Sequence, residues 1–192
     1  MRLRALSLVL LVGLFARPVV ASPIVSIEPG SNTVTTGSSF FLDVNITGVT
    51  DLFSFSFDLS YDPALLAFNE IVEGGFLQST GGTFFSAGDP PAAGSVTNIF
   101  DVVLGAVPGA DGDGTLARIN FTALGAGTST VSLSNLFMLD STISGISAST
   151  LDASVTASVP TAAPIPEPGT MVLVGSGLLA AWRGRRKLGL SA

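Results

Sequence analysis

The sequence contains neither cysteine nor histidine. Without thiols the chain forms no disulfide and no thiolate metal site. Without histidine it lacks the commonest general base and the commonest metal ligand. A G-x-S-x-G nucleophile elbow is also missing, and the only lysine, Lys187, lies near the C-terminus, outside any phosphate-binding loop. These absences exclude the usual serine hydrolases and P-loop nucleotide-binding proteins.

Charged residues are scarce too, at 11% of the 192 residues, whereas 47% are hydrophobic. Their distribution is uneven, because residues 22–166 carry 13 of the 14 acidic residues and a single basic residue, Arg118. This stretch therefore has a net charge of −12, compared with −6 for the whole chain. Such an acidic body repels nucleic acid and anionic lipid. The charge indicates either solubility outside the cell or cation binding, and it argues against a nucleic-acid partner.

The first 21 residues have the three parts of a secretory signal peptide. Arg2 and Arg4 form a positively charged start, and residues 5–16 form an apolar segment rich in leucine and valine. Small residues precede Ser22, so we expect signal cleavage between Ala21 and Ser22. The apolar segment is shorter than the roughly 20 residues that a membrane-spanning helix requires, which disfavours an uncleaved anchor.

The C-terminal part consists of several short segments. Residues 158–165 form a proline-rich linker, which we expect to be extended. Residues 166–187 contain a Pro-Glu-Pro turn, an apolar helix expected over Met171–Trp182 and a basic cluster, and residues 188–192 form a tail. The turn and the cluster comprise Pro166, Glu167, Pro168, Gly169, Arg183, Arg185, Arg186 and Lys187. These residues alone indicate either a plain membrane anchor or a sorting tail that is removed after recognition.

The order of turn, helix and basic cluster resembles the PEP-CTERM sorting signal of Gram-negative bacteria. The resemblance implies that an exosortase, a membrane protease-transpeptidase, recognises Glu167 and its flanking prolines as substrate residues. It also implies a producer that secretes extracellular polysaccharide. The exported domain would be held transiently at the inner membrane through the C-terminal helix and then delivered to the cell surface or the extracellular matrix.

Between the two ends, alternation of apolar and polar residues predicts an all-β domain over residues 22–157. The expected strands are 24–28, 39–49, 52–61, 66–72, 83–87, 95–104, 114–124, 130–139 and 151–159. A short turn over Asp62–Leu65 is the only helical candidate in this part. Nine strands separated by Gly, Pro, Asp and Asn clusters indicate a β-sandwich.

The alternation also predicts which side chains face the core. In residues 52–61, we expect the odd-numbered aromatic and leucine residues to point inward, and Leu52 to point the other way. In the four strands with the clearest alternation, the expected inward residues are Phe40, Leu42, Val44, Ile46, Phe53, Phe55, Phe57, Leu59, Tyr61, Ala117, Ile119, Phe121, Ala123, Leu151, Ala153, Val155 and Ala157.

The strand order and the turns resemble a cohesin-type domain. The similarity is carried by residues 31–77, with the turn at Gly37 and the Tyr-Asp-Pro sequence at Tyr61, and by residues 112–135, with Gly127 before a strand. It implies a flattened jelly-roll sandwich of about nine strands. Cohesin domains dock calcium-loaded dockerin modules, and related sandwiches bind polysaccharide.

Asp111 and Asp113 stand two residues apart among glycines and are the candidate calcium ligands. The twelve-residue EF-hand pattern is not met, because Leu116 occupies the required glycine position and Thr122 the position of the bidentate acid. Two interpretations remain. The aspartates either form a tight turn before a strand, or they bind calcium together with carbonyl groups and another acid.

Carboxylate pairs provide little support for catalysis. Asp58 with Asp62, or Glu70 with Glu73, would need a cleft and one raised pKa to act as a glycosidase pair, whereas Asp62 before proline is a natural turn residue. We therefore expect a protein that is not an enzyme and has no resident cofactor other than calcium.

The function expected from the sequence is an exported interaction module at the cell surface or in the matrix. Its partner would be a dockerin-like exported protein. The alternative is a carbohydrate-binding module for the producer's own polysaccharide. Exposed aromatic rings are needed for that role, but the single Trp182 lies in the tail, and Phe84 and Phe85 are expected in the core.

Overall fold

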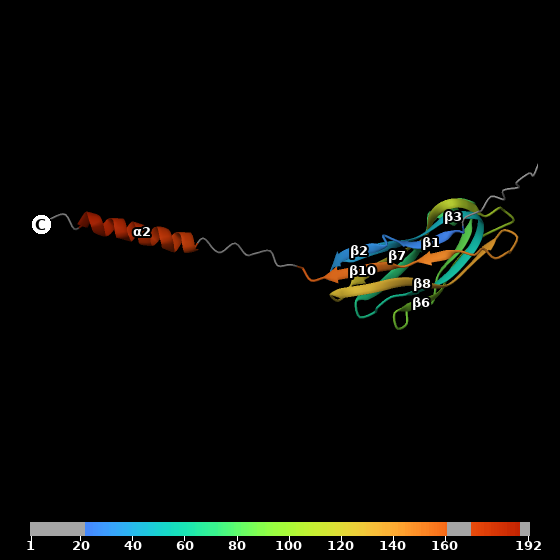
Figure 1. Cartoon of the computed structure of the whole chain (residues 1–192), viewed down its shortest axis with the longest axis horizontal. Coiled ribbons are helices and arrows are strands. Elements are labelled where there is room, and N and C mark those ends of the chain that lie inside the picture. The colour runs from blue at the N-terminus through green and yellow to red at the C-terminus, as the bar shows by residue number, and fades with distance from the viewer. Residues whose placement is uncertain (1–21, 161–169, 189–192) are drawn as a thin grey trace, which may run out of the picture. The chain divides into compact units, whose positions relative to one another are not determined.

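The computed structural model describes residues 22–160 and 170–188. The chain divides into two compact units, Met1–Ser158 and Val159–Ala192. The first unit is an all-β domain, as expected, with one short helix (Figure 1). Its elements are β1 (Ile24–Glu28), β2 (Ser31–Thr35), β3 (Ser39–Ser60), β4 (Leu66–Glu73), α1 (Gly75–Gln78), β5 (Thr83–Ala87), β6 (Ser95–Val103), β7 (Ala110–Ala123), β8 (Gly127–Asp140), β9 (Ser149–Leu151) and β10 (Ala153–Ser158).

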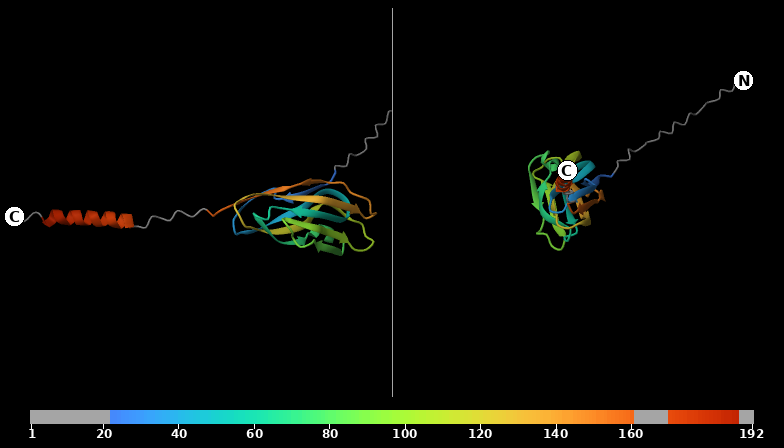
Figure 2. Two further views of the ribbon diagram at one scale, coloured as in Figure 1. Left: turned by 90° about the horizontal axis from the view of Figure 1, so that it is seen from below. Right: turned by 90° about the vertical axis from the view of Figure 1, so that its left-hand side faces the viewer.

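The strand β3 joins two layers of a sandwich. Its first half pairs with β1 and β7, and its second half pairs with β6 and β8. A first sheet therefore has the order β9-β1-β3-β7-β4, and a second sheet has the order β2-β10-β8-β3-β6-β5. The two further views in Figure 2 show the strands of this domain from other sides.

The inner faces of the sheets form one hydrophobic core, because alternate residues of each strand point between the layers. The expected inward residues of the first half of β3 and of β7 are buried, except that Phe40 is partly buried and packs against the core, and the side chain of Phe121 is fully buried. Its ring lies 5.3 Å from the ring of Tyr61, 5.8 Å from that of Phe40 and 6.1 Å from that of Phe68, measured between centroids. These aromatic contacts link β3, β4 and β7.

The expected phase of alternation is wrong at the middle of β3. Leu52 is fully buried, although it was expected to face outward, and Phe53 is only half-buried. The pairing with β8 shifts register between Leu52 and Ser54, and Asp51 has a left-handed backbone with φ of 57°. A bulge at this point reverses the side of the following residues. From Phe55 to Leu59 the expected inward residues are buried.

Several other expectations about the strands need correction. The strands expected over 39–49 and 52–61 form the single strand β3, and the sequence did not predict β2, β9 or the short helix α1. Leu151 is 55% exposed, because it lies in the edge strand β9 and not in β10. Residues Asp62–Leu65 form a turn in which the Asp62 carboxylate accepts a hydrogen bond from the Ala64 amide at 2.9 Å.

In the second unit, α2 (Thr170–Leu188) contains the helix expected over Met171–Trp182. Its apolar side chains Val172, Leu173, Leu178 and Leu179 are exposed. Neither helix in the described part of the chain combines the length and the apolar character needed to cross a membrane. The motif residues Pro166, Glu167, Pro168 and Gly169 and the cleavage residue Ala21 lie outside the described residues, as do the side chains of Arg185, Arg186 and Lys187.

Candidate interaction surface

The outer face of the second sheet carries aromatic side chains from three strands, β5, β6 and β8. Phe100 of β6 lies opposite Ser86 of β5 on one side and Ser56 of β3 on the other. Ser56 in turn lies opposite Phe137 of β8. Because directly opposed residues point to the same face of a sheet, these four side chains form one row on the outside of the sandwich.

A second row runs beside the first one. Phe84 of β5 lies opposite Val102 of β6, which lies opposite Ser54 of β3. Ser54 lies opposite Leu139 of β8. The rings of Phe84 and Phe100 are 5.9 Å apart, so the two rows are in contact. We call the five apolar residues of these rows the apolar patch: Phe84, Phe100, Val102, Phe137 and Leu139.

Two members of the apolar patch are strongly exposed, Phe84 at 57% and Phe137 at 58%. The expectation that Phe84 belongs to the core is therefore wrong, while Phe85 is partly buried and packs against the core. Large apolar side chains that are grouped and surrounded by polar residues mark binding surfaces more often than isolated exposed residues do.

One end of the same face is acidic and well ordered. The carboxylate of Asp58 accepts hydrogen bonds from the Asn98 backbone amide at 2.9 Å and from the Asn135 side-chain amide at 2.6 Å. Both asparagines have left-handed backbones, with φ of 58° and 51°, which asparagine adopts more readily than most residues. The Asp89 carboxylate accepts hydrogen bonds from the Thr97 hydroxyl and the Asn98 side chain. Asp58 and Asp89 thus hold negative charge beside the apolar patch.

The candidate calcium ligands, Asp111 and Asp113, bind the backbone of β3 where this strand passes from one sheet to the other. The Asp113 carboxylate accepts a hydrogen bond from the Gly48 amide at 2.6 Å, and the Asp111 carboxylate accepts one from the Asp51 amide at 2.8 Å. The backbone pairing of β3 with β7 is irregular between Ile46 and Leu52. The two side chains therefore satisfy amides that the strand pairing leaves free.

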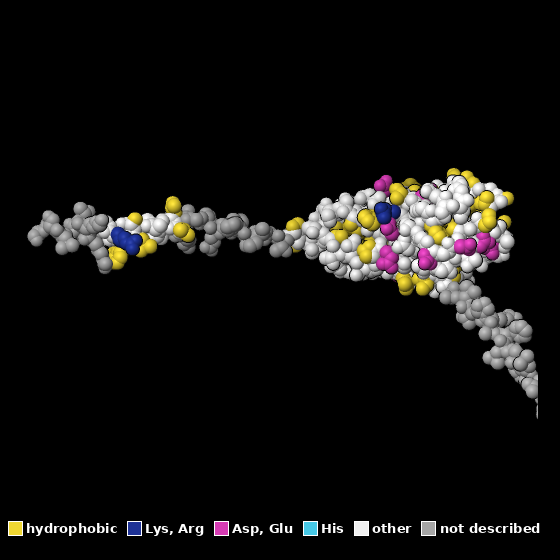
Figure 3. Space-filling view, turned by 90° about the horizontal axis from the view of Figure 1, so that it is seen from above, with side chains coloured by type: hydrophobic (Ala, Val, Ile, Leu, Met, Phe, Trp, Pro, Cys, Tyr) yellow, Lys and Arg dark blue, Asp and Glu magenta, His cyan; other side chains and the backbone are white. Residues whose placement is uncertain are grey.

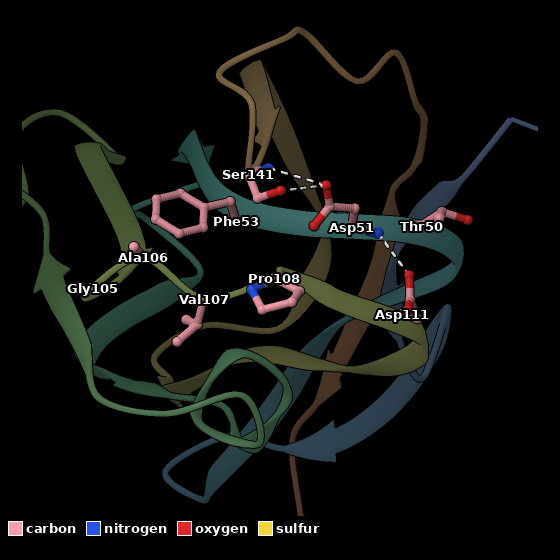
Figure 4. Close-up of a pocket in the computed structure, with 9 residues that line it drawn as sticks. All are labelled: Thr50, Asp51, Phe53, Gly105, Ala106, Val107, Pro108, Asp111 and Ser141. Carbon is pink, nitrogen blue, oxygen red and sulfur yellow. Dashed lines mark hydrogen bonds between the residues drawn. The ribbon is translucent and has the colours of Figure 1, made fainter.

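Asp51 is held by the loops on the other side of the crossing. Its carboxylate accepts hydrogen bonds from the Ser141 hydroxyl and the Gly109 amide, both at 2.6 Å. These hydrogen bonds, with the one from the Ser141 hydroxyl contributing most, lower the pKa of Asp51. Asp51, Asp111 and Ser141 line a hollow of about 590 Å³ together with Phe53 (Figure 4). In Figure 4 the carboxylates point to protein donors.

Within the described part of the chain, no group of three or more acidic residues is placed to hold a metal ion. Calcium binding at Asp111 and Asp113 therefore stays a prediction. The two interpretations predict different effects of replacing Asp113 with asparagine. The side-chain oxygen of asparagine can still accept the Gly48 hydrogen bond, so a purely structural role would be largely preserved.

We expect Asp113→Ala to lower the melting temperature of the domain by about 4 °C, since it removes one hydrogen bond of about 1 kcal/mol. Asp113→Asn should lower it much less. Melting curves with calcium chloride and with a chelator check this expectation. If calcium raised the melting temperature of the wild type and of neither variant, Asp113 would be a calcium ligand.

The other carboxylates singled out in the sequence do not form a catalytic pair. Asp58 is bound by two asparagines and Asp62 caps a turn. Glu70 accepts a hydrogen bond from the Asn120 side chain at 3.1 Å. Glu73 instead interacts with Asp101, a residue that was not predicted from the sequence. The signal that could have identified it is an acidic residue within the apolar run Ile99–Leu104.

The fold and the exposed face define a β-sandwich interaction module. The family model of the cohesin domain matches residues 25–157, and that of the PEP-CTERM protein-sorting motif matches residues 164–187. The chain belongs to the cohesin domain family. Cohesin domains are non-catalytic interaction modules, and the sorting motif marks the chain as an exported surface protein. Comparison with curated proteins finds no match.

Solved cohesin structures share the fold at low sequence identity. A non-cellulosomal cohesin from Archaeoglobus fulgidus is 17% identical, with a TM-score of 0.58, and the match covers 72% of this chain and 92% of that one. A type II cohesin of Acetivibrio cellulolyticus is 18% identical, with a TM-score of 0.58 and coverages of 70% and 95%. The Clostridium thermocellum Coh-OlpC–Doc435 cohesin–dockerin complex gives 13% identity, a TM-score of 0.60 and coverages of 72% and 95%.

Proposed function

We propose that the domain docks an exported, dockerin-like partner protein through the outer face of the second sheet. The observation that carries this proposal is the apolar patch, in which Phe84 and Phe137 are more than half exposed on the outer face of the sheet. Aromatic side chains of this kind supply much of the binding energy of protein interfaces. That solved structures of the same fold include cohesin–dockerin complexes supports the proposal.

The charges of the domain restrict the partner. Residues 22–166 carry a net charge of −12, and Asp58 and Asp89 lie at one end of the face. Acidic side chains are also visible on the side of the domain shown in Figure 3. A partner with apolar residues at the centre of its contact surface and lysine or arginine at one end fits this arrangement best.

We propose that the C-terminal segment is read by an exosortase-type sorting enzyme. Glu167 and its flanking prolines are the substrate residues, and the helix with its basic flank associates with the inner membrane of a Gram-negative producer until processing. The domain is then released to, or attached at, the cell surface or the extracellular matrix. The match of the sorting-motif model to residues 164–187 supports this part.

We expect protein recovered from the cell surface to lack the basic C-terminal end, and Glu167→Ala to reduce processing at least tenfold. Intact-mass spectrometry of the recovered protein measures both effects. Arg118→Ala, outside the motif, is the matched control and should be processed like the wild type. Surface-recovered wild type that still ends at Ala192 would show that the tail is not removed.

A second function is favoured by the same exposed rings. Phe84 and Phe137 can stack on sugar rings, and the side chains of Asn98, Asn135 and Asp58, on the same sheet, can accept and donate hydrogen bonds. The sequence argued against carbohydrate binding because Phe84 and Phe85 were expected in the core. The exposure of Phe84 removes this argument. The alternative is therefore binding of the producer's own extracellular polysaccharide.

One retention experiment separates the two functions. The purified domain, residues 22–163, which includes the described residues 22–158 of the first compact unit, is incubated with the producer's extracellular matrix in calcium or in chelator. Retained protein that is lost with chelator, and lost with Phe137→Asp, supports docking. Retained polysaccharide, insensitive to chelator, supports the alternative. Material retained equally by wild type and Phe137→Asp would contradict both.

A further inference from the structure

A buried carboxyl group lies directly under the apolar patch. Asp101 of β6 is 1% exposed, and it lies opposite Phe55 of β3 and Phe85 of β5 on the inner side of the second sheet. One of its carboxylate oxygens accepts a hydrogen bond from the Val102 amide at 2.8 Å. The other oxygen is buried and has no hydrogen-bond donor. A buried oxygen without a donor is costly and calls for an explanation.

The group beside this carboxyl is another acid. Glu73, at the end of β4, accepts a hydrogen bond from the Thr83 hydroxyl of β5. Thr83 pairs with Val103, two residues from Asp101 on the same side of β6, so the Glu73 carboxyl is held next to Asp101 and interacts with it. Two carboxylates in contact have no hydrogen atom to share unless one of them is protonated. Burial, and secondly the charge of Glu73, raise the pKa of Asp101 to about 6.

Among the described residues of the β domain, no basic side chain is available to neutralise the pair. Neither β5 nor α1 contains a charged residue. On β7, the Arg118 guanidinium is bound to Asp43 at 2.6 Å. Among the other acids of β3 and β4, Asp58 is bound by asparagines and Glu70 by Asn120. Two carboxylates and one hydroxyl also provide fewer oxygens than the six to eight that calcium takes.

We propose that Glu73 and Asp101 form a proton-operated latch that joins β4 of the first sheet to β5 and β6 of the second. In mildly acidic surroundings the Asp101 carboxyl is protonated and donates a hydrogen bond to Glu73, so the latch is closed. At neutral pH the Asp101 carboxyl loses this proton and is repelled by Glu73, and the edge formed by β5 and β6 is held less firmly. Phe84, Phe100 and Val102 of the patch belong to these two strands.

The direction of the pH effect follows from proton linkage. Between the ordinary aspartate pKa of 3.8 and the folded value of about 6, the folded state binds a proton that the unfolded state has lost. The contribution of Asp101 to stability is thus fully present below the lower value and is lost as pH rises through the upper one. The ratio of folded to unfolded protein should fall about a hundredfold over this range. Asp51 and Asp140, whose pKa values are lowered, act in the opposite direction.

Urea unfolding of the domain, residues 22–163, at about pH 4 and about pH 7.5 tests the latch. Asp101→Asn keeps the acceptor for Val102 and supplies a permanent donor to Glu73. From the lower to the higher pH, the ratio of folded to unfolded protein should rise about a hundredfold for this variant relative to the same ratio for wild type. Asp152→Asn removes the same charge from an exposed position and should track the wild type.

Two further measurements complete the test. Glu73→Gln keeps an acceptor for Thr83 and should show a smaller gain in the same direction, because Glu73 is the second cause of the shift. In wild type, the amides of β5 and β6 should exchange hydrogen faster at neutral pH than the intrinsic pH dependence of amide exchange predicts. In Asp101→Asn this acceleration should be absent. Equal pH dependence in wild type and Asp101→Asn would overturn the latch. Restoration of wild-type stability by calcium at neutral pH would also overturn it, since the pair would then hold a cation.

Discussion

Replacing Phe137 with aspartate should strongly weaken binding of the partner protein and leave the domain folded. Phe137 is 58% exposed, so its loss removes little core packing, and surface substitutions usually change stability by less than about 0.5 kcal/mol. In a complex, however, a central aromatic residue contributes about 2 kcal/mol or more, and an unpaired carboxylate in its place adds a desolvation cost. We therefore expect partner affinity to fall by a factor of about 30 or more.

The matched control lies on the other side of the sandwich. Phe41 is 47% exposed on the outer face of the first sheet, where the Arg118 guanidinium lies 4.1 Å from its ring centroid. Phe41→Asp introduces the same change at a comparable exposure and should retain the partner. Calorimetric titration of both variants, with melting curves to confirm folding, measures the difference. Equal losses in the two variants would mean that the second sheet is not the docking face.

The largest effect on stability is expected from Gly74→Ala. Gly74 lies between β4 and α1, and a methyl group there would meet the carbonyl oxygen of Thr115 at 2.0 Å. Its amide donates a hydrogen bond to the Leu116 carbonyl at 2.9 Å, so the backbone cannot move away without losing this bond. The clash involves backbone atoms of β7, which has no freedom to adjust. We expect a loss of about 3 kcal/mol or more, and a fall in melting temperature of about 10 °C or more.

The neighbouring glycine provides the control for this prediction. A methyl group on Gly75 meets no atom within 4 Å, and the residue lies at the start of α1. Gly75→Ala should be neutral or slightly stabilising, because alanine has the higher helix propensity. Comparing the melting temperatures of Gly74→Ala and Gly75→Ala with that of wild type tests this prediction. If both melted at the wild-type temperature, the close approach of β4 and β7 at Gly74 would be wrong.

The strand pattern and the sorting tail could be predicted because both are local properties of the sequence. Alternation of residue type reports which side of a strand is buried, and it correctly placed Leu42, Val44, Ile119 and Phe121 in the core. The sorting signal is a short motif followed by an apolar helix and a basic cluster. Neither requires knowledge of which strands are neighbours.

The phase slip in β3 could not be predicted because it depends on distant residues. The bulge at Asp51 is held by Gly109, Asp111 and Ser141, which lie 58 to 90 positions further along the chain. The edge strand β2 is missed for a related reason. Its polar sequence, Ser31–Thr35, alternates only weakly and becomes a strand through its parallel pairing with β10.

The candidate binding face was also hidden in the sequence, although each of its strands was expected. Phe84, Phe100 and Phe137 come from three strands, and only the pairing of β5, β6, β3 and β8 places them on one face. Asp111 and Asp113 show the reverse case. They formed a recognisable local pattern, yet in the structure their carboxylates accept hydrogen bonds from the amides of β3.

Chemical-shift mapping of the isotopically labelled domain with the retained partner tests the central claim most directly. The account predicts that the amide signals of Ser56, Phe100 and Phe137, on the outer face of the second sheet, shift or broaden on binding. The signals of Phe41 and Arg118, on the first sheet, should stay unchanged. Shifts confined to the first sheet, or to the hollow lined by Asp51 and Ser141, would contradict docking through the apolar patch.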